Sequence, residues 1–150
     1  MDSLHTDPLL LTVLLVTGFV GCAEFASVAL VHPVIRRLPE PSQVLMESGL
    51  LTTFGRVMPV GMTAAAVLAG IGAARYQPLA FTLAAVVLTI ALIVTIIGNV
   101  PINLWQSRVE GDDVPDGFIA RRRRWDLFQA IRGSLQLLGF VLVAFGTASL

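Results

Sequence analysis

The sequence predicts an all-α membrane protein, a bundle of four transmembrane helices that forms a single integral membrane domain over residues 1–150. Three observations predict this class. The chain is 55% hydrophobic and only 13% charged, whereas a soluble domain carries about 25% charged residues. Four apolar stretches are each long enough to cross roughly 30 Å of hydrocarbon as a helix. Polar segments separate the stretches, which cover about residues 9–31, 49–74, 78–104 and 126–148.

The first span, about residues 9–31, contains one carboxyl and is expected to end at His32 and Pro33. A carboxyl within hydrocarbon is costly, so Glu24 is either a paired or protonated structural group or a functional one. His32 is either a residue of the helix end or part of a site. A second face of this span has small side chains that suit close helix packing; they are Gly18, Cys22 and Ala26.

The second span, about residues 49–74, follows a proline-rich segment, 33–48, that we expect to be a loop. Its polar side chains lie on one face and include Arg56 within the apolar stretch. Small residues recur at every fourth position, which predicts a packing seam for another helix or for another protomer. The seam consists of Gly61, Ala65 and Ala69.

The third span, about residues 78–104, ends in a pair of amides. Asn99 and Asn103 lie one turn apart beside Pro101. Pro101 has no N–H to donate to the carbonyl of Ile97, which leaves an acceptor free near the two asparagines. This combination favours a functional role over simple capping of the helix.

The fourth span, about residues 126–148, carries a polar stripe on an otherwise apolar helix. At 100° per residue, the side chains of the stripe fall within a strip roughly 60° wide. They are Trp125, Gln129, Arg132 and Gln136. A charged Arg132 inside such a helix costs about 3 kcal/mol unless it faces protein or water.

Four consecutive arginines, Arg121–Arg124, precede the fourth span. A cationic block can bind nucleic acid, but its position directly before a hydrophobic span favours a topology anchor, and no nucleic-acid partner is expected. Most arginines lie in the segments 33–48 and 107–125. These two loops are therefore expected to be cytoplasmic, with both termini outside.

With this topology the polar side chains of all four spans reach a similar depth. Glu24, Arg56 and Arg132 each lie about two turns from the cytoplasmic boundary, and the two asparagines lie at the same end of the third span. In hydrocarbon each group needs a partner or water. We therefore expect a polar pocket in the cytoplasmic half of the bundle. One carboxylate and two guanidinium groups leave one positive charge in excess, which would suit an anionic or oxygen-rich ligand.

The order of these features resembles the anthrone oxygenase-like family of small four-span membrane proteins. The resemblance rests on three pieces, which are Val31-His32-Pro33, the segment from Asn99 to Asn103, and Arg124-Trp125-Asp126 with Arg132 after it. It implies a membrane oxygenase that converts polycyclic anthrones to anthraquinones with dioxygen and without a dedicated organic cofactor. No residues are assigned as metal ligands. The expected partners are a hydrophobic small molecule and the lipid bilayer.

Such chemistry needs a base and donors for an enolate oxygen. The residues leave the base open between Glu24 and His32. The side chains expected to hold the oxyanion are Arg56, Arg132, Asn99 and Asn103. Trp125 either stacks on a flat substrate or lies at the membrane interface. Gln129 and Gln136 are expected to line the pocket.

Two other functions fit the same residues. His32 is a candidate axial ligand for haem, although His5, the other histidine, is expected on the opposite side of the membrane. The chain also suits a non-enzymatic transporter subunit or assembly protein, because the small-residue faces favour homo-oligomers. Oxygen consumption with an aromatic substrate, a Soret band and uptake into vesicles distinguish these functions.

Overall fold

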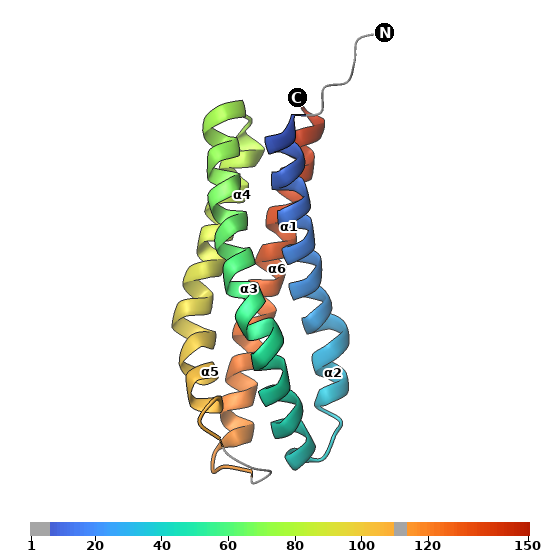
Figure 1. Ribbon diagram of the computed structural model, residues 1–150, viewed down its shortest axis with the longest axis vertical. Coiled ribbons are helices and arrows are strands. Elements are labelled where there is room, and N and C mark those ends of the chain that lie inside the picture. The colour runs from blue at the N-terminus through green and yellow to red at the C-terminus, as the bar shows by residue number, and fades with distance from the viewer. Residues whose placement is uncertain (1–6, 110–113) are drawn as a thin grey trace.

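The computed structural model describes residues 7–109 and 114–150 and forms an antiparallel bundle of four long helices (Figure 1). The four candidate membrane spans are Pro8–Ile35, Glu40–Tyr76, Leu79–Gln106 and Phe118–Ala148. The start of the first and the end of the last lie at the same end of the bundle (Figure 1). The prediction of an all-α membrane protein with four transmembrane helices is confirmed. The elements are α1 (Pro8–Ala26), η1 (Ser27–Val31), α2 (His32–Ile35), α3 (Glu40–Tyr76), α4 (Leu79–Val94), η2 (Thr95–Asn99), α5 (Val100–Gln106) and α6 (Phe118–Ala148).

The first and third spans continue through their prolines, so His32 and Pro33 do not end the first span. A proline removes one helical hydrogen bond and its ring crowds the carbonyl four residues earlier. Here a turn of π-helix ends two residues before each proline and widens the helix at that place. The N–H of His32 donates to the carbonyl of Ser27 in η1, and the N–H of Val100 donates to that of Thr95 in η2.

The second and fourth helices begin earlier than the sequence predicts. Helix α3 begins at Glu40, so most of the predicted loop 33–48 is helical. Pro41 lies in its first turn, where a missing N–H costs nothing. The side-chain amide of Gln43 reaches back to the carbonyl of Leu38 at 2.8 Å. Helix α6 begins at Phe118, so the arginine block is helical rather than part of a loop.

Asp7 connects the start of α1 to the end of α3, at the end of the bundle that holds the termini. Its side chain caps α1 by accepting from the N–H of Leu9 at 2.9 Å. The hydroxyl of Tyr76 donates to the same carboxylate at 2.6 Å, and Arg75 lies 3.3 Å away. The hydrogen bond from Tyr76, with help from the Leu9 N–H and the Arg75 charge, lowers the pKa of Asp7 below its ordinary value of 3.8.

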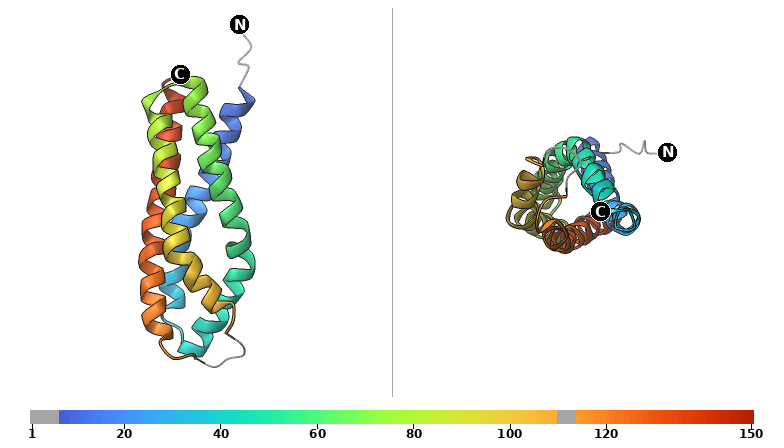
Figure 2. Two further views of the ribbon diagram at one scale, coloured as in Figure 1. Left: turned by 90° about the vertical axis from the view of Figure 1, so that its left-hand side faces the viewer. Right: turned by 90° about the horizontal axis from the view of Figure 1, so that it is seen from below.

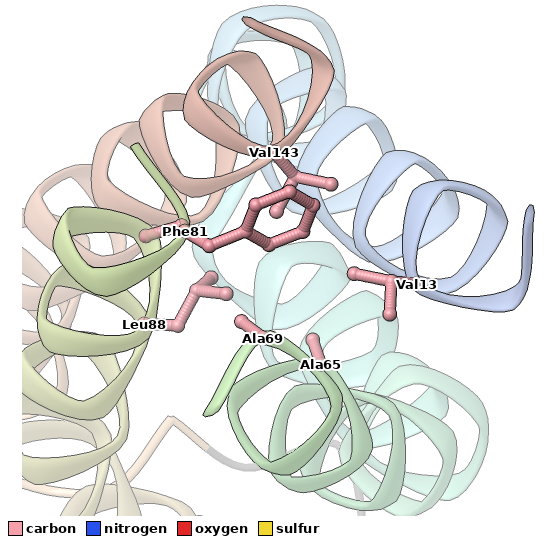
Figure 3. Packing of buried hydrophobic residues seen from close by; sticks show 7 residues of the cluster. Val13, Ala65, Ala69, Phe81, Leu88 and Val143 are labelled. Carbon is pink, nitrogen blue, oxygen red and sulfur yellow. The ribbon is translucent and has the colours of Figure 1, made fainter. Parts of the chain in front are cut away.

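The half of the bundle toward the termini has an apolar core (Figure 3). Phe81 fills its centre and the small residues Ala65 and Ala69 allow α3 to come close. The predicted seam therefore packs against helices of the same chain, and the Cβ of a larger residue at Gly61 would lie 2.8 Å from Val20. On the first span, Cys22 is exposed. The homo-oligomer stays a prediction. The buried core residues are Val13, Ala65, Ala69, Phe81, Ala84, Leu88 and Val143.

Helices α1 and α6 come into close contact at two glycines. A Cβ added to Gly21 would lie 2.8 Å from the backbone oxygen of Gln136, and one added to Gly133 would lie 3.2 Å from that of Glu24. Any side chain at these positions would push the two helices apart. Because Gly21 and Gly133 have no side chains, the carboxyl of Glu24 lies against the polar stripe of α6.

Candidate functional site

The deepest polar contact of the site joins α1 to α6. Glu24 has no exposed surface, and Arg132 is 7% exposed. The Nη2 of Arg132 donates to both carboxylate oxygens at 3.0 and 2.9 Å, and the Nε2 of Gln129 donates to Oε2 at 2.8 Å. Both oxygens of Glu24 are therefore occupied. Glu24 and Arg132, which the sequence predicts at a similar depth, thus form a buried ion pair.

Further amides lie buried near this pair. The Nδ2 of Asn99 donates to the backbone oxygen of Trp125 at 3.4 Å. Gln136 is fully buried, and neither of its amide atoms has a hydrogen-bond partner among the described residues. The Nε of Arg132 and the Oε1 of Gln129 are likewise buried without a partner in the described part of the chain. Such groups need water or a ligand, because a buried polar atom left unpaired costs about 1–3 kcal/mol.

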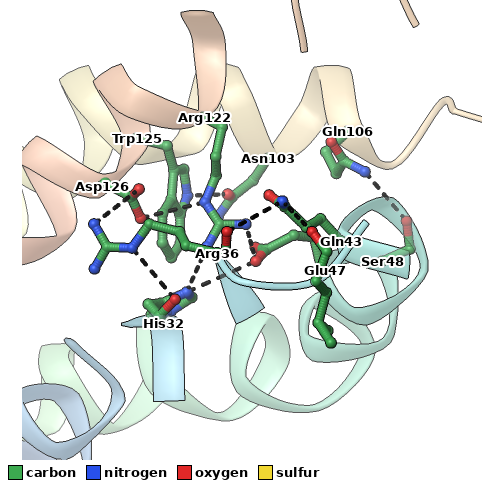
Figure 4. A network of polar contacts seen from close by, with 11 residues as sticks. His32, Arg36, Gln43, Glu47, Ser48, Asn103, Gln106, Arg122, Trp125 and Asp126 are labelled. Atoms are coloured by element: carbon green, nitrogen blue, oxygen red, sulfur yellow. Dashed lines mark hydrogen bonds and ion pairs between the residues drawn. The ribbon is translucent and has the colours of Figure 1, made fainter. Parts of the chain in front are cut away.

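A second polar cluster lies nearer the loops and draws on all four spans (Figure 4). Arg122 of α6 is at its centre: it forms an ion pair with Glu47 of α3 and donates from Nε to Asp126 at 3.2 Å. Its Nη2 lies 2.9 Å from the Nδ1 of His32 at the start of α2. Asp126 also pairs with Arg36 at 3.4 Å.

The contact with Arg122 fixes the tautomer of His32. A guanidinium group only donates, so Nδ1 must accept and a neutral ring carries its proton on Nε2. The carboxylate of Glu47 lies 3.7 Å from the same Nδ1. If His32 gains a proton on Nδ1, a carboxylate is already beside it.

Trp125 connects the second cluster to the third span. Its Nε1 donates to the Oδ1 of Asn103 at 2.7 Å, and its ring meets that of His32 edge-on with centroids 4.8 Å apart. A tryptophan held at its N–H and against a second ring has a fixed orientation. The oxygen of Asn103 is occupied, which leaves its amide hydrogens as donors.

Beside these clusters lies a cavity of about 310 Å³. One side is polar, with His32, Glu47, Asn103, Arg122, Trp125, Gln129 and Arg132 among its lining residues. The rest of the lining is mainly apolar and includes Leu50, Leu51, Phe54, Met58, Ile102 and Leu104. Of the predicted site residues, five therefore border the cavity: His32, Asn103, Trp125, Gln129 and Arg132. Glu24, Asn99 and Gln136 are buried but are not part of its lining.

Arg56 does not join this group. Its side chain is exposed and is not part of the cavity lining, although its neighbour Gly55 is. The face that Arg56 shares with Thr52 and Thr63 points away from the core. The expected excess of one positive charge counted Arg56 in the pocket, so that expectation is wrong. The charge of Arg132 is balanced by Glu24. Among the buried charges of the cavity lining, Arg132 is paired with Glu24 and Arg122 with Glu47 and Asp126.

Sequence reasoning missed Glu47 and Arg122, which are both buried. Each could have been found by extending a helix backward by one or two turns. Arg122 lies seven residues before Gln129 and fourteen before Gln136, so it continues the polar stripe of the fourth span. Glu47 lies four residues before Leu51 and seven before Phe54, on the face of α3 that borders the cavity.

The fold and the site define a multi-pass membrane protein with a cavity lined by both apolar and polar side chains. The anthrone oxygenase family model matches residues 43–142, and the chain belongs to that family. The match includes Glu47, Arg122 and Arg132, whereas Glu24 and His32 precede it. No curated protein and no solved structure matches the chain. In the described residues no group of three or more His, Cys, Asp or Glu side chains is arranged to hold a metal ion.

Proposed function

We propose that this chain is a membrane oxygenase that uses dioxygen to convert a flat, polycyclic anthrone-type substrate to a quinone. One observation carries the proposal: a cavity of about 310 Å³ whose lining is largely apolar but includes His32, Arg122, Gln129 and Arg132. A ligand site with these properties suits a hydrophobic molecule that has a few oxygen atoms on one edge. The membership in the anthrone oxygenase family supports the same reaction class.

The reaction starts with removal of a proton from the methylene group that is conjugated to the anthrone carbonyl. We assign the base to His32, which borders the cavity, rather than to Glu24, whose two oxygens are held by Arg132 and Gln129. Proton uptake on Nδ1 requires Arg122 to release that nitrogen. Arg122 keeps Glu47 and Asp126 as partners, and Glu47 then stabilises the imidazolium ion.

The enolate oxygen needs donors that are already in place. Arg132 borders the cavity and its Nε has no partner in the described residues. Asn103 has amide hydrogens that are not used by its bond from Trp125. Glu24 acts as a positioning residue, because it holds the guanidinium group of Arg132 through two hydrogen bonds. Asn99 and Gln136, buried behind the cavity, support this wall rather than contact the substrate.

Dioxygen balances the reaction without a further oxidant. The enolate transfers one electron to dioxygen, and the radical and superoxide combine to form a peroxide anion at the former methylene carbon. This anion takes back the proton held by His32 and becomes a hydroperoxide. Loss of water gives the quinone. The carbon loses two hydrogens and gains one oxygen atom, while the second oxygen atom leaves as water with those two hydrogens. The proposal therefore includes no cofactor besides dioxygen.

The alternative with haem makes a different prediction. Arg122 occupies Nδ1 of His32 and the ring packs against Trp125, so an axial bond would have to break this arrangement. His5 lies outside the described residues. A Soret band in the purified protein, lost in a His32→Ala variant, would favour haem. Substrate-independent uptake into sealed vesicles would favour a transporter subunit, and loss of a partner complex without loss of oxygen consumption would favour an assembly protein.

The direct test measures oxygen consumption and quinone formation by the protein in nanodiscs, against spontaneous oxidation in empty nanodiscs. With heavy-isotope dioxygen, one labelled atom should enter the quinone and the other should enter water. A His32→Asn variant should lose this activity. Equal rates in protein-containing and empty nanodiscs, over a range of anthrones, would overturn the proposal.

For topology we propose that the loop end of the bundle, with Arg36, Arg37 and the Arg121–Arg124 block, is cytoplasmic and that both termini are outside. Arginine-rich short loops are retained on the cytoplasmic side. A single cysteine at Leu150 in a Cys22→Ser background should react with an impermeant thiol reagent in intact cells. A single cysteine at Leu38 should react only after the membrane is opened, and the reverse pattern would refute this topology.

A further inference from the structure

The cavity has a rim that faces outward between two spans. Gly55 and Pro59 of α3 border it and are exposed. On the other side, Val100 and Leu104 of α5 border it and are 36% and 57% exposed. These four residues carry no charge, and both helices belong to candidate membrane spans. The lower parts of α3 and α5 face each other across this place in the side view (Figure 2).

Several side-chain contacts lie at the end of the cavity toward the loops. Gln106 donates to the hydroxyl of Ser48 at 3.3 Å and so joins α5 to α3. Phe118 at the start of α6 is 3% exposed. The guanidinium group of Arg121 lies 4.4 Å from the ring centroid of Trp105. These contacts separate the apolar rim from the loop end of the bundle.

We propose that the opening between α3 and α5 is a lateral entrance through which the planar aromatic ligand passes from the bilayer into the cavity. The identity of the ligand rests on the proposed function, but entry does not require turnover. An apolar rim within the span lets a hydrophobic molecule move from lipid to the cavity without crossing water. Gly55 keeps the entrance open, because its missing side chain leaves room on the α3 side.

Gly55 is suited to a test because a larger residue there is tolerated. A Cβ at this position would meet only the side chain of Leu51, at 3.4 and 3.7 Å, which is ordinary contact. Gly70 of the same helix is a matched control, because it is also exposed and a Cβ there would meet nothing within 4 Å. Gly55→Phe and Gly70→Phe thus add the same ring to the same helix, at the rim and far from it.

The cavity contains its own fluorescent reporter. The chain has two tryptophans, Trp105 and Trp125, and both border the cavity. In a Trp105→Phe background, quenching of Trp125 by anthraquinone measures occupancy of the cavity. The measurement is made in liposomes without oxygen, so that no turnover occurs. Gly55→Phe should slow quenching by about tenfold or more, whereas Gly70→Phe should leave the rate unchanged.

The equilibrium amplitude adds a second criterion. A ring at an entrance slows both entry and exit, so the ligand concentration for half-maximal quenching should change little in Gly55→Phe. Equal association rates for the two glycine variants would place the route elsewhere and overturn the proposal. A loss of equilibrium binding in Gly55→Phe would mean that Gly55 belongs to the binding site and not to an entrance, which also overturns it.

Lipids with brominated acyl chains separate a failed entrance from a failed function. These lipids quench a tryptophan that the bilayer can reach, and they require no particular substrate. They should quench Trp125, and Gly55→Phe should reduce that quenching while Gly70→Phe does not. If anthraquinone fails to bind but this pattern holds, the proposed function is wrong and the entrance stands. If brominated lipids do not quench Trp125 in either the parent protein or the control, the entrance does not exist.

Discussion

Replacing one partner of the Glu24–Arg132 pair should strongly destabilise the bundle. Glu24→Leu leaves the guanidinium group of Arg132 buried, without the two hydrogen bonds of 2.9 and 3.0 Å that it now makes. Breaking a buried pair by removing one partner costs about 3–5 kcal/mol, because an uncompensated charge stays in a region of low polarity. Arg132→Leu should cost a similar amount, since it leaves the fully buried carboxyl of Glu24 with only Gln129.

The double variant Glu24→Leu with Arg132→Leu should recover much of this loss. Replacing a buried pair by apolar residues of similar volume is often neutral or stabilising by about 1–4 kcal/mol. The pair contacts are short and both groups are almost fully buried, so the coupling energy from a double-mutant cycle should exceed about 3 kcal/mol. Equilibrium unfolding in mixed micelles of SDS and a mild detergent provides the four free energies of unfolding.

Activity should follow a different order from stability. The double variant is expected to fold, yet it lacks the donor that we assign to the enolate oxygen, so quinone formation should stay at the level of empty nanodiscs. Additive single-variant costs would refute the geometry of the pair. A double variant with normal turnover would refute the role of Arg132 in catalysis even if the stabilities agree.

The remaining predictions address a base, a control and a capping residue. His32→Asn should lower the rate of quinone formation by about 10²–10⁴-fold, the typical contribution of a general base, with little change in half-maximal quenching of Trp125; an unchanged rate would remove His32 from the mechanism. Arg56→Leu should keep the rate within about twofold of the parent, because its side chain is exposed and outside the cavity, and a large loss of turnover would contradict this placement. Because the folded pKa of Asp7 lies below its ordinary value of 3.8, its contribution to stability is full above that value and is lost as the pH falls through the lowered pKa. Asp7→Asn should therefore lower the melting temperature at neutral pH and flatten its fall in acid, and parallel curves for the two proteins would exclude this role.

The sequence predicts the fold class and the levels of the polar groups because both follow from periodicity. Charged side chains are rare in the spans, and the position of each one along a helix determines the helix face on which it lies. The stripe from Trp125 to Gln136 thus leads directly to the wall that holds Arg132. Periodicity within one helix cannot say which face meets its neighbours. Arg56 and Arg132 look alike in sequence, but close contact at Gly21 and Gly133 turns the face of α6 inward, whereas the face with Arg56 remains outside.

Helix starts account for the residues that sequence reasoning missed. Proline-rich and arginine-rich segments are typical of loops, so Glu47 and Arg122 were expected outside the bundle. In the structure α3 and α6 extend beyond the apolar stretches. In these extensions Glu47 of α3 and Arg122 of α6 form an ion pair with each other. Arg122 is 6% exposed and Glu47 is 8% exposed, so each supplies the charge that the other needs. Neither residue alone indicates such a partner, which comes from a helix far away in the sequence.

The two π-helical turns explain why the chamber lies in this half of the bundle. Each turn, η1 and η2, ends two residues before a proline, Pro33 or Pro101, in the corresponding span of the two helical hairpins. A π turn and a proline together bend a helix and leave backbone groups without their usual partners. Below η1 the first span runs outward at α2, whereas the half of the bundle toward the termini is packed around Phe81 (Figures 1 and 3). Regular helices through residues 27–31 and 95–99 would extend the close packing of the upper half toward the loops. Pro33 directly follows His32, and Pro101 lies two residues before Asn103, so both irregular turns lie next to side chains that border the cavity.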